Sequence, residues 1–163
     1  MKAGVAAPRW VQTLRFMARG GALVSPRAAL ELGEPLGLGR KTSISAFSLI
    51  STREGEVRIG ARTDVGTGCC ISGHPGGVSI GDDCLISPNV VIGGPPQASA
   101  EDAPEGRATL VGNNVWIGAG AVILPGAEIA DGVIVSPNSV VSGMVAANAI
   151  VQGNPAKTIF TRR

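Results

Sequence analysis

The sequence of 163 residues contains a single histidine, His74, within the stretch Gly-His-Pro-Gly-Gly. An imidazole gains and loses a proton near neutral pH, so His74 is the candidate for a general base. One histidine without a Cys-x-x-Cys pair is too few ligands for zinc, and we expect no metal.

The three cysteines, Cys69, Cys70 and Cys84, are odd in number and two are adjacent. They predict no disulfide framework and a reducing, cytoplasmic setting.

Aliphatic residues recur every six positions along most of the chain. The members of this series are Leu38, Ile44 and Ile50; Ile59, Val65 and Ile71; Ile80, Ile86 and Ile92; and Val111, Ile117, Ile123, Ile129, Val135 and Val141. A period of six fits neither a helix nor a simple alternating strand. It predicts a triangular coil of three short strands, whose inward residues stack in columns from one coil to the next.

A small or apolar residue follows twelve of these fifteen aliphatic residues by four positions and is predicted to fill a corner region inside the coil. These residues are Thr42, Ser48, Thr63, Cys69, Cys84, Val90, Val115, Ala121, Ala127, Val133, Ser139 and Val145. Because Cys69 and Cys84 belong to this inward column, we interpret them as core residues rather than as ligands or nucleophiles.

Three insertions interrupt the repeat. Two coils span 21 residues, from Leu38 to Ile59 and from Ile59 to Ile80, where a bare coil takes 18. The third insertion separates Ile92 from Val111 by 19 residues, where six suffice. Each insertion follows the third side of a coil, so all three should emerge at one corner, where a rigid scaffold commonly carries its chemistry.

His74 belongs to the second of these insertions. It lies three residues after Ile71, as Arg53 lies three residues after Ile50. One strand spacing should therefore separate the two loops, which makes Glu54 the candidate to orient the imidazole. The long third loop, at 93–110, is a candidate functional flap.

Two stretches near the C-terminus, "GNNVWIGAGAVILPGAEI" and "GNPAKTI", resemble the hexapeptide-repeat acetyltransferases. The resemblance covers roughly residues 37–159. It implies a left-handed parallel β-helix, acetyl-CoA as co-substrate, and a homotrimer with its active sites between neighbouring subunits. The sugar O-acetyltransferases are the most similar branch in these stretches.

The resemblance divides over the position of the base. The maltose and galactoside type carries its histidine five residues after the aliphatic that corresponds to Ile92, where this chain has Gln97. The serine-acetyltransferase-like branch carries it seven residues before a glycine, a spacing that His74 and Gly81 satisfy. We therefore assign the base to His74, and give Gln97 a supporting role as a donor to the thioester oxygen.

The resemblance also implies where the cofactor lies. The pantetheine arm should follow a groove beside the final coils, at positions that correspond to Ala119, Pro137 and Ser142. Trp116 should line this groove or the trimer interface, and Lys157 is a candidate for the phosphates.

Composition and hydropathy place few further demands on function. The net charge of +2 gives no reason to expect nucleic acid or an acidic membrane. No signal peptide is evident, and no apolar run reaches the roughly eighteen residues of a membrane span. Trp10, Leu14 and Met17 have helical spacing. The predicted organisation is an N-terminal segment with a short helix at 1–36, the all-β domain of the left-handed β-helix at 37–151 with its extruded loop at 93–110, and a tail at 152–163.

Taken together, these features predict an acetyl-CoA-dependent O-acetyltransferase that acts on a hydroxyl of a sugar or surface-polysaccharide precursor by direct transfer. Two alternatives stay open. One is an N-acetyltransferase acting on a nucleotide amino sugar, and the other is a non-catalytic β-helix that serves as a scaffold or binding trimer.

Overall fold

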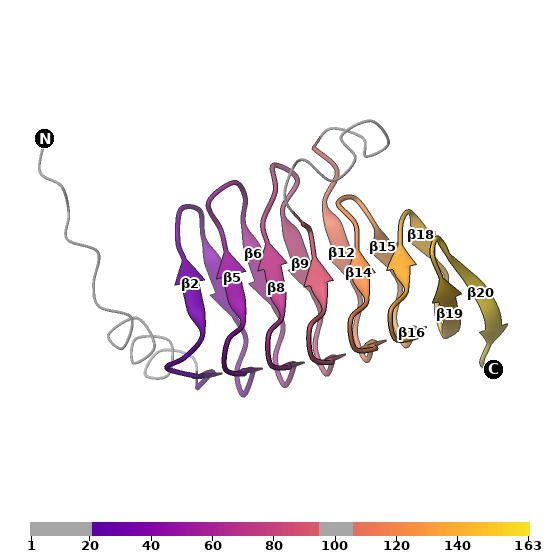
Figure 1. The fold of residues 1–163 in the computed structure, drawn as a ribbon, viewed down its shortest axis with the longest axis horizontal. Coiled ribbons are helices and arrows are strands. Elements are labelled where there is room, and N and C mark those ends of the chain that lie inside the picture. Colours follow the sequence, from indigo (N-terminus) through magenta and orange to yellow (C-terminus); the bar gives the residue numbers. More distant parts are fainter. Residues whose placement is uncertain (1–20, 95–105) are drawn as a thin grey trace, which may run out of the picture.

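The computed structural model describes residues 21–94 and 106–163, so the helix predicted around Trp10, Leu14 and Met17 lies outside the described residues. In the described ranges the chain forms twenty short β-strands, without any helix that could cross a membrane. The strands follow one another in three-sided coils that stack along a single axis (Figure 1). The all-β architecture of stacked coils predicted from the six-residue period is confirmed.

Each coil contributes one strand to each of three sheets. Sheet A contains β1 (Leu23–Val24), β4 (Ser43–Ile44), β7 (Asp64–Val65), β10 (Leu85–Ile86), β13 (Trp116–Ile117), β16 (Ile134–Val135), β19 (Ala149–Gly153) and β20 (Ala156–Thr161). Sheet B contains β2 (Ala29–Glu31), β5 (Leu49–Ser51), β8 (Cys70–Ser72), β11 (Val91–Ile92), β14 (Val122–Ile123) and β17 (Val140–Val141). Sheet C contains β3 (Leu36–Leu38), β6 (Val57–Ile59), β9 (Val78–Ile80), β12 (Thr109–Val111), β15 (Glu128–Ile129) and β18 (Met144–Val145).

The stacking register aligns the repeats with one another. In sheet A, for example, Ile86 of β10 pairs with Val65 on one side and with Ile117 on the other. The pairs between coils are parallel, and only the last pair, β19 with β20, is antiparallel. The predicted C-terminal tail is therefore a strand that folds back against the end of sheet A.

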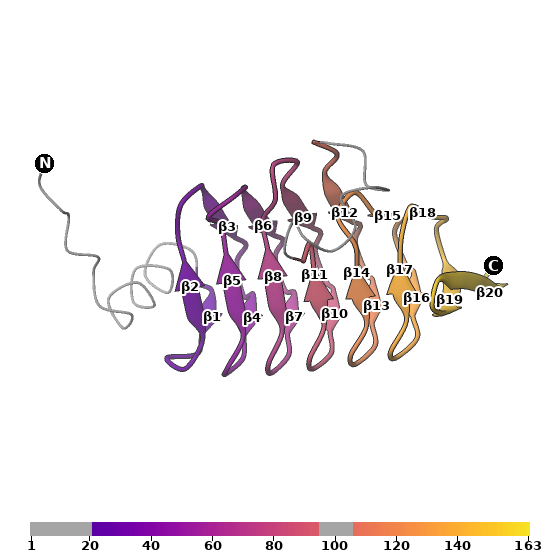
Figure 2. The ribbon, with the colours of Figure 1, turned by 45° about the horizontal axis from the view of Figure 1, so that its top comes forward.

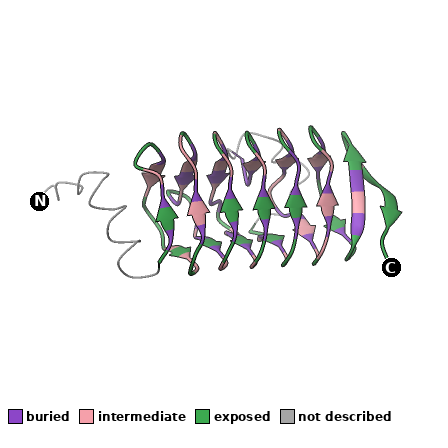
Figure 3. Ribbon diagram, turned by 90° about the horizontal axis from the view of Figure 1, so that it is seen from below, coloured by how far each residue is buried: buried purple, intermediate pink, exposed green. Residues whose placement is uncertain are grey.

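The inward columns form one continuous core. Ile86, Ile117, Ile123 and Val135 are fully buried, and Ile129 is nearly so, as the period predicted. Figure 3 shows the same pattern along the stack, with buried and more exposed residues alternating within the strands. Since the fold has few aromatic residues, these stacked aliphatic columns supply most of the apolar area that folding removes from water.

The smaller inward residues are buried as well, including Cys69 and Cys84. The polar members of the column donate to backbone carbonyls in the next coil. The Ser48 hydroxyl donates to Gly66 O at 2.8 Å, and the Cys84 thiol donates to Gly112 O at 3.1 Å. Burial raises the pKa of both core thiols. Cys69 and Cys84 are thus core residues, as predicted, and their hydrogen-bonding groups are satisfied within the stack.

Two corners of the coil are closed by columns of residues in the left-handed conformation. Between sheets C and A these are Lys41, Arg62, Asp83, Asn114, Gly132 and Asn148, and between sheets A and B they are Phe47, Gly68, Asn89, Gly120 and Asn138. Glycine and asparagine tolerate positive φ better than other residues, and they hold seven of these eleven positions. A left-handed residue at the same place in each coil lets the short strands turn sharply without insertions.

The third corner, between sheets B and C, carries the insertions. The connections from β5 to β6 and from β8 to β9 project from this one edge (Figures 1 and 2), and the described ends of the third connection leave β11 and enter β12 at the same corner. The three insertions therefore start from one corner, as predicted, and residues 95–105 of the third lie outside the described residues.

The coils begin earlier than residue 37, the boundary predicted from the repeat. β1 starts at Leu23, and Val24 and Leu30 occupy the inward columns of sheets A and B. These two residues are six apart, but Leu38 follows Leu30 by eight, which hides the first coil from a strict six-residue count. In the predicted loop at 93–110, Thr109 and Leu110 already belong to β12.

Candidate active site

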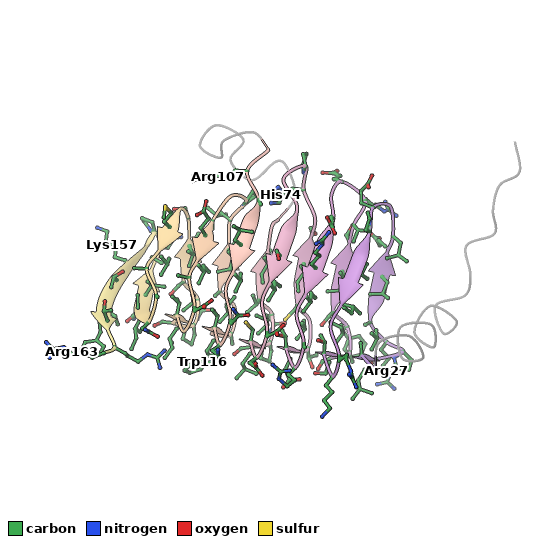
Figure 4. All side chains as sticks on the ribbon, turned by 180° about the vertical axis from the view of Figure 1, so that it is seen from behind. Arg27, His74, Arg107, Trp116, Lys157 and Arg163 are labelled. Atoms are coloured by element: carbon green, nitrogen blue, oxygen red, sulfur yellow. The ribbon has the colours of Figure 1, made fainter. Side chains whose placement is uncertain are left out.

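His74 lies in the insertion between β8 and β9, at the corner between sheets B and C. Its side chain is almost enclosed, with 6% of the residue exposed. Figure 4 shows His74 and Arg107 on the side of the molecule that carries the insertions, and Trp116 on the opposite side. The only imidazole of the chain is thus held where the insertions leave the coils.

Both ring nitrogens of His74 have partners. Nε2 lies 2.8 Å from the Thr109 hydroxyl, and the Gly76 N–H donates to Nδ1 at 3.2 Å. The Thr109 oxygen also accepts the Gly126 N–H at 2.9 Å. These contacts join the insertion that carries His74 to β12 and to the turn that precedes β15, so the ring has one defined orientation.

Thr109 is a partner of His74 that the sequence analysis missed, although the sequence carries a signal for it. In sheet C, Thr109 pairs with Val78, which in turn pairs with Val57. All three side chains are buried. A buried hydroxyl in a column whose other members, Leu36, Val57 and Val78, are apolar needs a polar partner, and His74 Nε2 lies within hydrogen-bond distance of it.

Burial lowers the pKa of His74 below its usual value. Desolvation disfavours the charged imidazolium. A proton on Nδ1 would also place that N–H against the Gly76 N–H, which is itself a donor. The ring is therefore neutral at pH 7, which is the form a general base requires.

This pKa shift predicts an acid-sensitive fold. The folded protein binds a proton at His74 less readily than the unfolded chain does. The contribution of His74 to the free energy of unfolding is therefore fully present above the unfolded pKa of about 6.5, and it is lost as the pH falls through the lowered pKa of the folded state. We expect the melting temperature to decline from pH 7 toward pH 5. In His74→Gln this part of the decline should disappear, and an unchanged pH profile would contradict the assignment.

Glu54, the residue predicted to orient His74, does not hydrogen-bond to the imidazole. The neighbouring loops do stack, since a Cβ on Gly55 would meet the His74 carbonyl, but Glu54 itself is exposed. Among the described residues no hydrogen bond or ion pair joins Glu54 to His74, and Arg53 pairs with Glu31 at 3.3 Å. Gln97 lies outside the described residues.

A pocket of about 290 Å³ adjoins the His74 loop. It is lined by Glu56, Arg58, Gly76, Gly77, Val78, Ser79 and Ala108. Glu56 and Arg58 form an ion pair at its edge, so the pocket offers both a cation and an anion to a polar ligand. Gly76 both lines the pocket and donates its N–H to His74 Nδ1, so the pocket lies beside a residue that contacts the imidazole.

A second groove, of about 260 Å³, continues over the outer face of sheet C. It is lined by Ser79, Leu110, Val111, Gly112, Glu128, Ile129, Ala130, Met144 and Val145. Ser79 lines both hollows, so the polar pocket and this more apolar groove adjoin. Arg107 forms an ion pair with Glu128 at 3.1 Å beside them. Over residues 21–94 and 106–163 no group of three potential metal ligands is present.

The residues predicted to bind the cofactor are spread over several parts of the prism. Ala119 and Pro137 are exposed on successive coils at the corner between sheets A and B, where the Asn138 N–H donates to Ala119 O at 2.9 Å. Trp116 lies on sheet A, 44% exposed, and its indole N–H donates to Ser87 Oγ at 3.0 Å.

The two remaining residues that were predicted to bind the cofactor are also exposed. Ser142 follows β17 at the corner between sheets B and C, and Lys157 lies on β20. Small exposed residues such as Ala119 and Ser142 leave room for an extended arm, and Lys157 could hold its phosphates. A single chain nevertheless does not bring the sheet A–B corner together with His74.

Comparison with known protein families finds the same six-residue repeat that forms the coils. Residues 108–143 match the bacterial transferase hexapeptide family (six repeats), and residues 56–93 match the hexapeptide repeat of succinyl-transferase. A putative lipopolysaccharide biosynthesis O-acetyl transferase of Escherichia coli K12 is 36% identical over 103 residues, 63% of this chain and 49% of that protein. The galactoside O-acetyltransferase of the same organism is 37% identical over 87 residues, 50% of this chain and 43% of that protein. This chain thus spans about half the length of these relatives.

Solved structures share the fold. An N-acyltransferase from Bacillus cereus, AntD, in complex with dTDP and coenzyme A, superposes with a TM-score of 0.77 over 93% of this chain and 89% of that chain, at 21% identity. The polysialic-acid-specific acetyltransferase NeuO superposes with a TM-score of 0.68 over 86% of this chain and 68% of that chain, also at 21% identity.

The stacked three-strand coils form a parallel β-helix, and the superposition on AntD gives it the left-handed winding that the resemblance predicted. Two segments of the chain, residues 56–93 and 108–143, thus match the hexapeptide repeats of bacterial transferases, and the relatives above are named as O-acetyltransferases.

Proposed function

We propose that the protein transfers an acetyl group from acetyl-CoA to a hydroxyl of a sugar or surface-polysaccharide precursor. The observation that carries this proposal is the neutral, buried imidazole of His74 at the insertion corner, beside a pocket with polar walls. The names of the relatives, which include lipopolysaccharide and galactoside O-acetyltransferases, support the same chemistry.

The reaction is a direct transfer. The acceptor hydroxyl oxygen attacks the thioester carbonyl carbon while His74 takes the hydroxyl proton. The C–S bond then breaks, the ester forms, and the proton passes to the sulfur of coenzyme A. Gln97 is proposed to donate to the thioester oxygen as negative charge develops there. Three free thiols suit a reducing compartment, and we place the enzyme in the cytoplasm.

We further propose that the protein is a homotrimer. One outward row of sheet B holds only uncharged residues that are half-buried even in one chain: Ala29, Leu49, Cys70, Val91, Val122 and Val140. The charged residue on this face is Glu31, at the end of β2, which pairs with Arg53. The corresponding row of sheet C contains the charged residues Arg58 and Glu128, and that of sheet A is interrupted by Asp64. A long apolar stripe of this kind is typical of a protein interface.

Packing sheet B about a three-fold axis would also complete the site. In a closed ring of three prisms, each edge of this face adjoins the opposite edge in the neighbour. Ala119 and Pro137 of one subunit would then approach His74 of the next. The cofactor positions and the base, which are separated within one chain, would face each other across the interface.

The assembly is tested by light scattering during gel filtration. We expect the parent protein to have the mass of a trimer, and Val91→Glu to give folded monomers, because three carboxylates would be buried without partners at the interface. Ser79→Glu, on the outward face of sheet C, is the matched control and should remain trimeric. A monodisperse parent monomer would refute the proposal.

The activity is tested by incubating the protein with acetyl-CoA and a panel of free sugars, oligosaccharides and nucleotide amino sugars. Chromatography should be used to measure released coenzyme A and the product, since the protein's own thiols would react with a thiol reagent. We expect an O-acetylated sugar. Product on an amine alone would favour N-acetylation, and acetyl-CoA binding with no transfer to any acceptor would favour the non-catalytic alternative.

A further inference from the structure

The hydrogen bonds around His74 determine which nitrogen carries the proton. A backbone N–H can only donate, so the Gly76 contact at 3.2 Å requires a lone pair on Nδ1. In the neutral ring the proton must then be on Nε2, where it donates to Thr109 Oγ1 at 2.8 Å. The opposite tautomer would place two donors face to face and leave the Gly76 N–H without this acceptor.

The Thr109 hydroxyl is itself held in place. It is fully buried, and its oxygen accepts the Gly126 N–H at 2.9 Å as well as the imidazole Nε2–H. Both lone pairs of the oxygen are therefore used. Because β12 and the turn before β15 are parts of the rigid stack, Thr109 anchors the far side of the ring to the core.

In this arrangement the basic nitrogen faces Gly76, which is a residue of the pocket wall. Gly76, whose N–H contacts Nδ1, lines the 290 Å³ pocket together with Gly77. A hydroxyl bound there could replace the Gly76 N–H as the partner of Nδ1. Nearby ionised side chains are already paired, Glu56 with Arg58 and Arg107 with Glu128, and neither pair contacts the ring through a hydrogen bond among the described residues.

We infer that His74 accepts the substrate proton at Nδ1, and that Thr109 is a positioning residue that holds Nε2–H and so keeps Nδ1 toward the acceptor pocket. The inference rests on the proposed transferase activity for its functional part. The tautomer and the anchoring contact are properties of the folded protein that can be measured without any substrate.

The single histidine makes the test direct. In protein labelled with ¹⁵N at histidine, the imidazole gives one set of ring signals. We expect at pH 7.5 a protonated Nε2, an unprotonated Nδ1, and an Nε2–H proton that exchanges slowly because it is buried and bonded. A protonated Nδ1 in the neutral ring would overturn the assignment of the basic atom.

Thr109→Val tests the anchor. Valine occupies the same column at Val57 and Val78, so the substitution suits the packing and replaces the hydroxyl by a methyl group, which removes the acceptor of both the His74 Nε2–H and the Gly126 N–H. We expect the Nε2–H signal to broaden by exchange and kcat to fall by roughly tenfold to a hundredfold, with KM for acetyl-CoA nearly unchanged, because the base loses its orientation. Thr109→Ser should restore both readouts.

Retention of the sharp Nε2–H signal and of full kcat in a folded Thr109→Val protein would overturn the anchoring role. Failure of the proposed activity would look different. In that case the parent would transfer no acetyl group to any acceptor, while the tautomer and the effect of Thr109→Val on the ring signals would still be observed.

Discussion

Replacing Ile86 by aspartate should leave no soluble, folded protein, whereas the same replacement at the adjacent Leu85 should leave the fold intact. The two residues form β10 in the middle of the stack, but Ile86 is 0% exposed and Leu85 is 50% exposed. Ile86 stacks between Val65 and Ile117, so a carboxylate there has no water and no partner.

The expected size of the effect follows from two costs. Removing a large aliphatic side chain from a core costs about 2–5 kcal/mol, and burying an unpaired carboxylate adds several kcal/mol more. Together these approach or exceed the whole stability of a typical domain, about 5–15 kcal/mol. Circular dichroism and the soluble yield of both variants provide the measurement. A cooperative melt of Ile86→Asp near the parent's temperature would show that the inward register is wrong.

Loss of the His74 imidazole should lower acetyl transfer by roughly a hundredfold or more, which is the usual loss when a general base is removed. We expect this result for His74→Ala, with binding of acetyl-CoA little changed, because Ala119 and Pro137, the proposed cofactor positions, lie at a different corner of the coil. Steady-state release of coenzyme A and calorimetric titration with acetyl-CoA measure the two properties separately.

His74→Gln distinguishes chemistry from structure. Glutamine offers a donor for Thr109 and an acceptor for the Gly76 N–H, the two contacts that the imidazole makes, but it cannot take a proton at neutral pH. The variant should therefore fold well and still be nearly inactive. Transfer by His74→Gln at most of the parent's rate, in an active parent, would exclude His74 as the base and leave positioning alone to explain catalysis.

Much of the fold could be predicted from the sequence because its repeat is strictly periodic. Each coil buries the same kinds of residue at the same places, so Ile86, Ile117 and Ile123 revealed the inward columns, and the surplus residues revealed a shared looped corner. Cys69 and Cys84 could be assigned to the core for the same reason. The first coil escaped this count because the eight residues from Leu30 to Leu38 break the period.

The site depended on contacts that no spacing describes. The sequence identified His74 by its residue type and its place in an insertion, and stacking of the loops pointed to Glu54 as its partner. In the tertiary structure the imidazole instead turns inward and contacts Thr109, 35 residues away along the chain, and Gly76 within its own loop. Side-chain direction within an insertion is decided by the buried polar groups that need partners, and only the folded stack brings the Thr109 hydroxyl, the Gly126 N–H and the ring of His74 to one place.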